Sequence, residues 1–202
     1  MGERKLEIPD DGRSALTAMP TAFGHAVLGI SALAVFPQEA LPKRSWLLGI
    51  AVSIAPDLDV IAFRFGIPYS HPFGHRGFFH SLLFAWLVAA TAAIVASSRS
   101  EPRRRPAVLA AYLFVCAASH GLLDTLTDGG LGIAILSPFS NRRFFAPWRP
   151  ISVSPIGLRH FLLGPAGEVL LSELLWIGLP CIAVVLTAMY VRSRKPRHEG
   201  SR

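Results

Sequence analysis

Charged residues are scarce in this sequence. Only 16% of its 202 residues are charged, whereas 51% are hydrophobic and the mean hydropathy is +0.44. Soluble domains carry about 25% charged residues, so this chain has too few to cover a water-facing globule, and it is too apolar for intrinsic disorder. It also contains only two cysteines, which argues against a disulfide scaffold and against a cysteine-rich structural zinc site.

Long runs without charge are present instead. Four charge-free windows cover residues 14–38, 77–98, 106–123 and 174–191. A bilayer-spanning helix needs about 20 mostly apolar residues, with about 17 as the lower limit, and each window is long enough. We therefore predict an all-α, polytopic membrane bundle of four or five transmembrane helices, with helices over about 21–36, 78–97, 107–126 and 168–191.

A fifth apolar segment, 46–65, is interrupted by acids. Asp57 and Asp59 follow Pro56 within it. If the helix continues through Phe63, it is long enough to span the bilayer and buries two carboxylates. If it stops at Pro56, it is a short or half-inserted helix, and the sequence leaves both interpretations open.

The remaining segments differ in composition from these helices. Residues 1–20 form a polar segment whose first thirteen residues carry a net charge of −1; because a secretory signal starts positive, we expect the first helix to be retained. Residues 21–191 form the membrane-embedded domain, and residues 192–202 form a basic tail. Within the domain, residues 127–167 are rich in Gly, Pro, Arg and aromatics, which predicts an extramembrane or interfacial loop with room for a short re-entrant piece.

The distribution of arginine predicts the orientation. Short loops dense in Lys and Arg stay in the cytoplasm. The loop 99–105 has four arginines, and the tail 192–202 has five basic residues. With both inside, the C-terminus is cytoplasmic, the helices 78–97 and 168–191 start at the outer face, and the helix 107–126 ends there.

Histidines and acids collect at these outer ends of the predicted helices. His120 and Asp124 are four residues apart, which places them on one face of a helix. Asp57 and Asp59 are about 200° apart on a regular helix, but a turn after Pro56 would let them converge. The same layer contains His25, His75 and His80.

Together these residues predict a metal site. Each has a plainer interpretation when taken alone, as an interfacial histidine bonded to backbone or as a solvated helix end. Ionisable groups within membrane helices are nevertheless costly, and four imidazoles with three carboxylates in one layer require a shared cation. Such ligands suit zinc first, with manganese or iron as alternatives. We predict one or two divalent ions held by His25, Asp57, Asp59, His75, His80, His120 and Asp124.

Arginines near this layer predict the substrate. Arg76 lies between His75 and His80, and Arg142 and Arg143 lie in the loop 127–167. Arginine binds phosphate bidentately, so all three are predicted to bind a phosphate-bearing substrate, the alternative being anchorage to lipid headgroups. Anionic lipid also explains the basic residues that flank the membrane, so no nucleic-acid partner is expected despite a pI of about 10.2.

Three blocks of sequence resemble a known family. Residues 56–59 (PDLD), 75–81 (HRGFFHS) and 119–127 (SHGLLDTLT) resemble, in order, the blocks of the YdjM-type inner-membrane proteins. Residues 137–144 resemble the segment after the last block, and Phe79 stands where the family often has a small polar residue. The resemblance covers about residues 22–150. It implies a LexA-regulated, metal-dependent hydrolase of the inner (plasma) membrane, distantly similar to zinc-dependent phospholipases C and a related nuclease fold.

The predicted function is membrane-bound, metal-dependent hydrolysis of a phosphoester, phospholipase-like, at the membrane surface, with lipid as partner or substrate. Asp57 is predicted to be a ligand or the base that orients water, His75 a ligand or general acid, and Arg76 the phosphate-binding group. One alternative is an ion or proton-coupled transporter, whose His and Asp residues would line up through the membrane. Another is a non-catalytic protein whose structural metal has a closed ligand shell.

Overall fold

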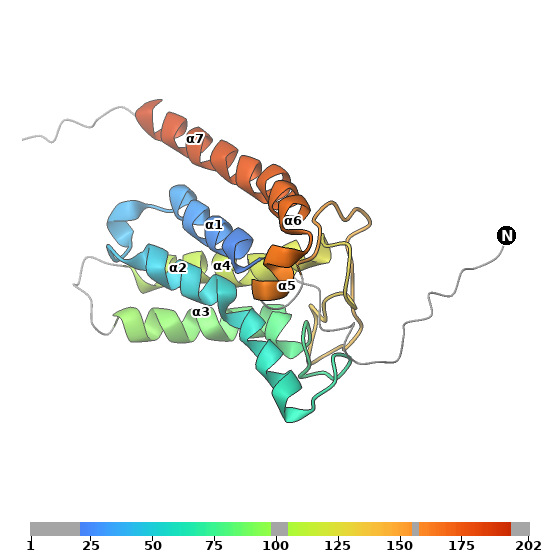
Figure 1. The fold of residues 1–202 in the computed structure, drawn as a ribbon. Coiled ribbons are helices and arrows are strands. Elements are labelled where there is room, and N and C mark those ends of the chain that lie inside the picture. Colours follow the sequence, from blue (N-terminus) through green and yellow to red (C-terminus); the bar gives the residue numbers. More distant parts are fainter. Residues whose placement is uncertain (1–20, 98–104, 155–157, 195–202) are drawn as a thin grey trace, which may run out of the picture.

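The computed structural model describes residues 21–97, 105–154 and 158–194. The polar segment 1–20, most of the arginine-rich loop 99–105 and all but the start of the basic tail lie outside this part of the chain. The described elements are helical, which confirms the predicted fold class (Figure 1). Only two isolated β-bridges accompany the helices in this part of the chain, Thr127 with Ile151 and Ile133 with Phe144.

Five apolar helices form the bundle. The first is α1 (Ala22–Ala32), extended by the short turn η2 (Leu33–Val35). The second is α2 (Ser45–Ile54), which continues as the 3₁₀ segment η4 (Ala55–Phe65). The third and fourth are α3 (Leu82–Ser97) and α4 (Pro106–Thr125). The last is a continuous rod of α6 (Ala166–Glu173), the π-helical turn η6 (Leu174–Gly178) and α7 (Leu179–Arg194).

Three of these helices are long and apolar enough to cross a membrane. They cover Ser45–Phe65, Pro106–Thr125 and Ala166–Arg194, whereas Ala22–Val35 and Leu82–Ser97 are apolar but shorter. The open question at Pro56 is thereby answered, because the helix continues past it. Proline is tolerated in the first turn of a helical segment, and this segment ends only at Gly66, which has a left-handed φ of 72°.

The loop predicted over 127–167 is irregular as far as residue 154. The expected re-entrant piece is absent from that described portion, since residues 132–136 form turns and a single bridge rather than a helix. A short helix, α5 (Leu158–Leu163), precedes the final rod. Irregular backbone at the end of a membrane bundle is tolerated where it is covered by protein or faces water.

Small residues allow the helices to approach closely. Ala85, Ala89 and Ala93 are buried on α3, which packs against α4. Gly29 of α1 faces Gly49 of α2, and the Tyr112 hydroxyl from α4 donates to the Gly29 carbonyl at 2.9 Å. A Cβ on Gly49 would collide with that hydroxyl. Such contacts are typical of membrane helix interfaces, and they hold α1, α2 and α4 together.

One end of the bundle carries the polar layer. The start of α1, η4, the short 3₁₀ turn η5 (Phe78–His80) before α3, and the end of α4 lie next to the irregular loops in Figure 1. The end of α3, the start of α4 and the end of α7 lie at the opposite end. Side chains from four segments distant in sequence therefore meet in one place.

Candidate metal centre

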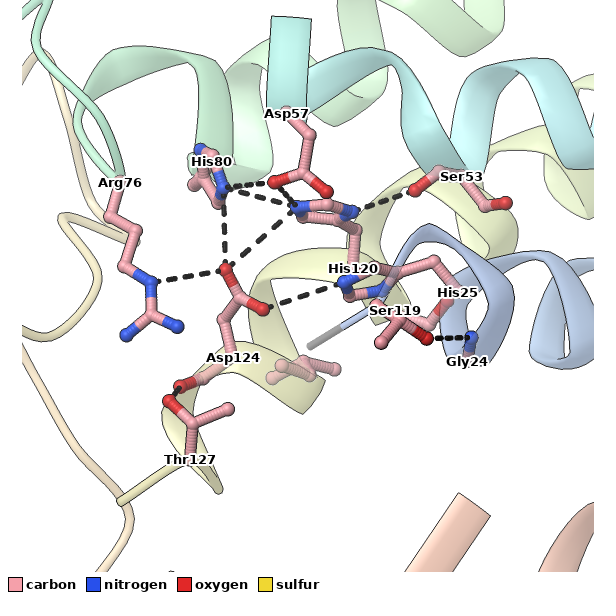
Figure 2. Close-up of polar contacts among 12 residues, drawn as sticks. Gly24, His25, Ser53, Asp57, Arg76, His80, Ser119, His120, Asp124 and Thr127 are labelled. Carbon is pink, nitrogen blue, oxygen red and sulfur yellow. Dashed lines mark hydrogen bonds and ion pairs between the residues drawn. The ribbon is translucent and has the colours of Figure 1, made fainter. Parts of the chain in front are cut away.

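Four buried side chains place ligand atoms around one point. Asp57, His80, His120 and Asp124 each offer one ligand atom, and these atoms lie within 4.8 Å of one another. His120 Nε2 is 3.3 Å from Asp57 Oδ1, and His80 Nε2 is 3.3 Å from Asp124 Oδ2 (Figure 2). The four residues come from η4, η5 and α4, so the cluster joins three elements of the bundle.

The two imidazoles in this cluster direct their Nε2 atoms inward. His120 Nδ1 is 2.7 Å from the Ser53 carbonyl, which can only accept, so Nδ1 carries the proton and Nε2 the lone pair. His80 Nδ1 lies 3.1 Å from Asp59 Oδ2, at ion-pair distance but without a hydrogen bond. The two Nε2 atoms then face each other at 3.0 Å. Metal-binding histidines are commonly held as His120 is, with the other ring nitrogen on a carbonyl or carboxylate.

Asp59 lies on the other side of the His80 ring from Asp57. Asp59 Oδ1 is 2.6 Å from His75 Nδ1, and Asp59 Oδ2 accepts the backbone N–H of Arg76 at 3.1 Å. The two acids therefore do not converge on one point. Asp59 with His75 and His80 forms a second group with metal-ligand spacing, and His75 Nε2 makes no hydrogen bond within the described structure.

His25 and Arg76 both contact Asp124. His25 Nε2 is 3.5 Å from Asp124 Oδ1, and its ring stacks on His120 with centroids 3.8 Å apart. Arg76 Nε is 3.4 Å from Asp124 Oδ2, while Arg76 NH1 donates to the Gly129 carbonyl at 2.8 Å. Both side chains are buried, so each Asp124 oxygen has a cationic or imidazole nitrogen at ion-pair distance but no hydrogen bond.

Charge and unpaired atoms test whether a cation fits. Three buried carboxylates (Asp57, Asp59 and Asp124) face one buried guanidinium, so with neutral histidines the cluster carries a net charge of −2. Both oxygens of Asp57 and both of Asp124 lack a hydrogen bond to any described residue. Buried charges require a partner of opposite sign. A single divalent cation among these oxygens and imidazoles would neutralise the cluster, so the residues fit a metal.

The backbone of Arg76 is itself unusual. Its φ of 61° is the only left-handed value at a non-glycine residue in the described part of the chain. That conformation costs free energy in a residue with a Cβ. It lets the N–H of Arg76 bind Asp59 and its carbonyl accept the Ala134 N–H at 3.0 Å, while its side chain reaches Asp124.

The two loop arginines lie apart from the four-residue cluster. Arg142 is exposed and lies over the Phe144 ring. The Arg143 guanidinium donates to backbone carbonyls of two loops, including that of Tyr69 at 2.9 Å and that of His75 at 3.1 Å. Burial lowers the pKa of the Arg143 guanidinium. Burial raises the pKa of the Tyr69 phenol, and the nearby Arg76 charge partly offsets that rise. Arg143 thus ties the segment that carries His75 to the long loop.

Several residues of the centre were not predicted from the sequence. The Ser53 carbonyl orients His120, and a main-chain atom leaves no signature in the sequence. Gly121 lies beside His120, and a Cβ there would be 2.6 Å from the His80 carbonyl oxygen. Glu173 is buried near the start of α1. The sequence does single out Glu173, because this acid directly precedes the charge-free window 174–191.

We expect Gly121→Ala to destabilise the protein by about 1–3 kcal/mol, the usual cost of overpacking. The added methyl group must push η5, which carries His80, away from α4, because its nearest neighbour is backbone. Cys116 and Cys181 are free and buried, so reaction with a thiol-reactive fluorophore during heating measures unfolding.

Gly167→Ala is the matched control, because nothing lies within 4 Å of a Cβ at Gly167 in α6. If the Gly121→Ala protein unfolds at the same temperature as the Gly167→Ala protein, the close contact between α4 and η5 is wrong.

Comparison with known proteins gives a family-model match and a relative. The model described as YdjM inner membrane protein matches residues 19–196. The chain is 38% identical to the inner membrane protein YbcI of Escherichia coli (strain K12) over 166 residues, which are 80% of this chain and 92% of that protein. No solved structure matches the chain.

Proposed function

This chain belongs to the YdjM inner membrane protein family, and we propose that it is a membrane-embedded, metal-dependent hydrolase of phosphoesters. The observation that carries the proposal is the set of four inward-facing ligand atoms of Asp57, His80, His120 and Asp124. Two imidazole nitrogens and two carboxylate oxygens are a donor set that zinc accepts, with manganese or iron as alternatives. The net charge of −2 favours one divalent ion over two.

The remaining residues have roles that follow from their contacts. When bound, such an ion lowers the pKa of a water ligand toward about 7 and stabilises charge on phosphoryl oxygens. Asp57 has 7% side-chain exposure, whereas the side chains of the other three ligands are fully buried. That small exposure does not reach the carboxylate, because both Asp57 oxygens are buried without a hydrogen bond to a described residue. With one oxygen as a ligand, the other is placed to orient a water molecule.

Two further buried side chains have a nitrogen without a hydrogen bond. His75 Nε2 is free to take or give a proton, because only Nδ1 is engaged, by Asp59. Arg76 keeps one terminal nitrogen, NH2, without a hydrogen bond in the described structure, and this nitrogen can donate to a phosphoryl oxygen. Arg142 is exposed and Arg143 donates to backbone carbonyls, and their contact with substrate stays a prediction.

The position of the centre supports a reaction at the membrane surface. The polar residues gather at one end of the bundle rather than along a path through it, which favours hydrolysis over transport. The opposite end carries the end of α3, the start of α4 and the end of α7, which adjoin the arginine-rich loop and the basic tail in the sequence. By the positive-inside rule, that end faces the cytoplasm and the metal centre faces outward, where lipid headgroups are the available phosphoesters.

Metal analysis combined with a hydrolysis assay tests the proposal. Purified protein in detergent is expected to contain about one divalent ion per chain and to hydrolyse bis(p-nitrophenyl) phosphate or vesicles of phosphatidylethanolamine and phosphatidylglycerol. His120→Ala is expected to lose both the ion and the activity, because it removes one of the four ligands. His71→Ala, a substitution of an exposed histidine outside the cluster, is expected to keep both.

Two results would contradict this function. Wild-type protein that binds no divalent ion rules out both the hydrolase and the structural-metal alternative. Protein that retains its ion but hydrolyses none of these phosphoesters supports the structural alternative instead.

A further inference from the structure

Glu173 is a buried carboxylate that the proposed reaction does not use. It lies where α6 passes into the π-helical turn η6, and its exposure is 3%. A small apolar cavity beside it is lined by Phe23, Val27, Leu170 and Ile177, among others. A charge in such surroundings is costly unless it is paired, and in membrane helices such residues usually mark function. Its partners therefore indicate its role.

Both oxygens of Glu173 bind Thr21. One accepts the Thr21 backbone N–H, and the other accepts the Thr21 hydroxyl at 2.6 Å. Thr21 is the N-cap of α1: its Oγ1 accepts the Gly24 N–H at 3.3 Å, and its carbonyl accepts the His25 N–H at 3.5 Å. A negative charge is also favourable at a helix N-terminus. Glu173 thus holds the residue from which the turn bearing His25 begins.

The contact between the two helices is tight at this point. A Cβ on Gly24 would lie 2.9 Å from Ile177 Cδ1 and 3.2 Å from Glu173 Cδ. The next residue, His25, stacks on His120 and lies 3.5 Å from Asp124. A continuous chain of contacts therefore runs from Glu173 through Thr21 and His25 to two of the four ligand residues.

At its other end, α1 is held by the same helical rod. Arg192 in the last turn of α7 donates to the carbonyls of Ala34 and Phe36, both at 2.7 Å. An acid at the N-terminal end of α1 and a guanidinium at its C-terminal end both suit the helix dipole. The final rod of α6, η6 and α7 therefore contacts α1 at both ends, which restrains movement of α1 along its own axis.

We propose that Glu173 is a positioning residue of the metal centre: by fixing Thr21, it sets the first turn of α1 and holds the His25 ring against His120 and Asp124. The proposal rests on the proposed function, because His120 and Asp124 are taken there as metal ligands. It assigns the C-terminal helix, which supplies no ligand, a share in the geometry of the centre.

Binding of Co²⁺ tests this role without an assay of turnover. The full chain in detergent is titrated with Co²⁺, and the visible absorption bands report both affinity and coordination geometry. Glu173→Ala leaves two donors of Thr21 unpaired, and we expect about five- to tenfold weaker binding, with shifted bands and an unchanged stoichiometry. This loss is at the lower edge of the 10- to 100-fold effects typical of groups that contact ligands directly. Glu173→Gln retains an acceptor for Thr21 and is expected to recover most of the affinity.

Glu168→Ala is the matched control, because Glu168 is an exposed acid on the same helix α6. Glu173→Ala with bands identical to the control and affinity within twofold of it overturns the proposal. Should Glu173→Ala fail to fold, Glu173→Asp decides, since it keeps the charge but withdraws the carboxylate by one methylene. At least threefold weaker Co²⁺ binding supports the proposal, and an affinity within twofold of the control overturns it.

The assay separates this proposal from the proposed function. Wild-type protein that binds Co²⁺ but hydrolyses no phosphoester overturns the hydrolase, while the Glu173 comparison still decides the positioning role. Wild-type protein that binds no Co²⁺ overturns both.

Discussion

Asp124→Asn is expected to weaken metal binding at least about 100-fold, which corresponds to about 2.7 kcal/mol. Asp124 is the ligand with the most partners, since its oxygens contact His25, Arg76, His80 and His120. Asparagine keeps the shape of the side chain but removes the charge and replaces one oxygen by a donor. Either orientation of the amide then loses an acceptor that the neighbouring donors or the cation require. Competition with a chromophoric chelator measures the affinity.

The control for this variant is Asp128→Asn. Asp128 is exposed and follows α4, and its Oδ1 accepts the Val153 N–H, a bond that the amide oxygen of asparagine preserves. We expect metal affinity within twofold of wild type for this control. Equal affinities for the two variants would show that Asp124 is not a ligand.

Arg76→Met is expected to destabilise the metal-free protein by about 3–5 kcal/mol, the usual cost of breaking a buried ion pair. The guanidinium is fully buried and is the one positive side chain paired with Asp124 in the described structure. Without it, three buried carboxylates lose their only fixed counter-charge. Excess Zn²⁺ should restore part of the stability, because the ion supplies positive charge at the same place. The thiol-reactive unfolding assay measures both effects.

Arg142→Met is the comparison for this result. Arg142 is a neighbouring arginine whose side chain is exposed over Phe144, and surface charges contribute little. If the Arg76→Met and Arg142→Met proteins unfold at the same temperature, and Zn²⁺ raises both temperatures equally, then Arg76 does not balance the charge of the centre.

The helices of this protein were predictable because composition and charge determine them. A charge-free window of 17 or more residues has few structures open to it besides a buried or membrane helix, and five helices lie where the windows and the 46–65 segment place them. Pro56 left the second helix ambiguous. A proline within a turn is compatible both with termination and with a change to 3₁₀ geometry, and only packing decides between them.

The sequence predicted which residues belong to the candidate centre better than it predicted how their side chains are arranged. Helix periodicity places His120 and Asp124 together, but it cannot show that Asp59 turns away to His75 while Asp57 faces His120. That division depends on the 3₁₀ geometry of η4 and on the left-handed backbone at Arg76. The roles of the Ser53 carbonyl and of Glu173 depend on contacts between helices distant in sequence, which no local pattern encodes.

The attachment of α1 has a consequence for the order of assembly. Translation produces α1 long before the final rod, yet the contacts that fix its ends join residues separated by 152 and 158 positions, Thr21 with Glu173 and Ala34 with Arg192. Contacts this distant in sequence form late and slowly. During synthesis, the segments that carry Asp57, His80, His120 and Asp124 can associate before the two ends of α1 are fixed. The centre is therefore completed only when the last helix of the chain has been inserted.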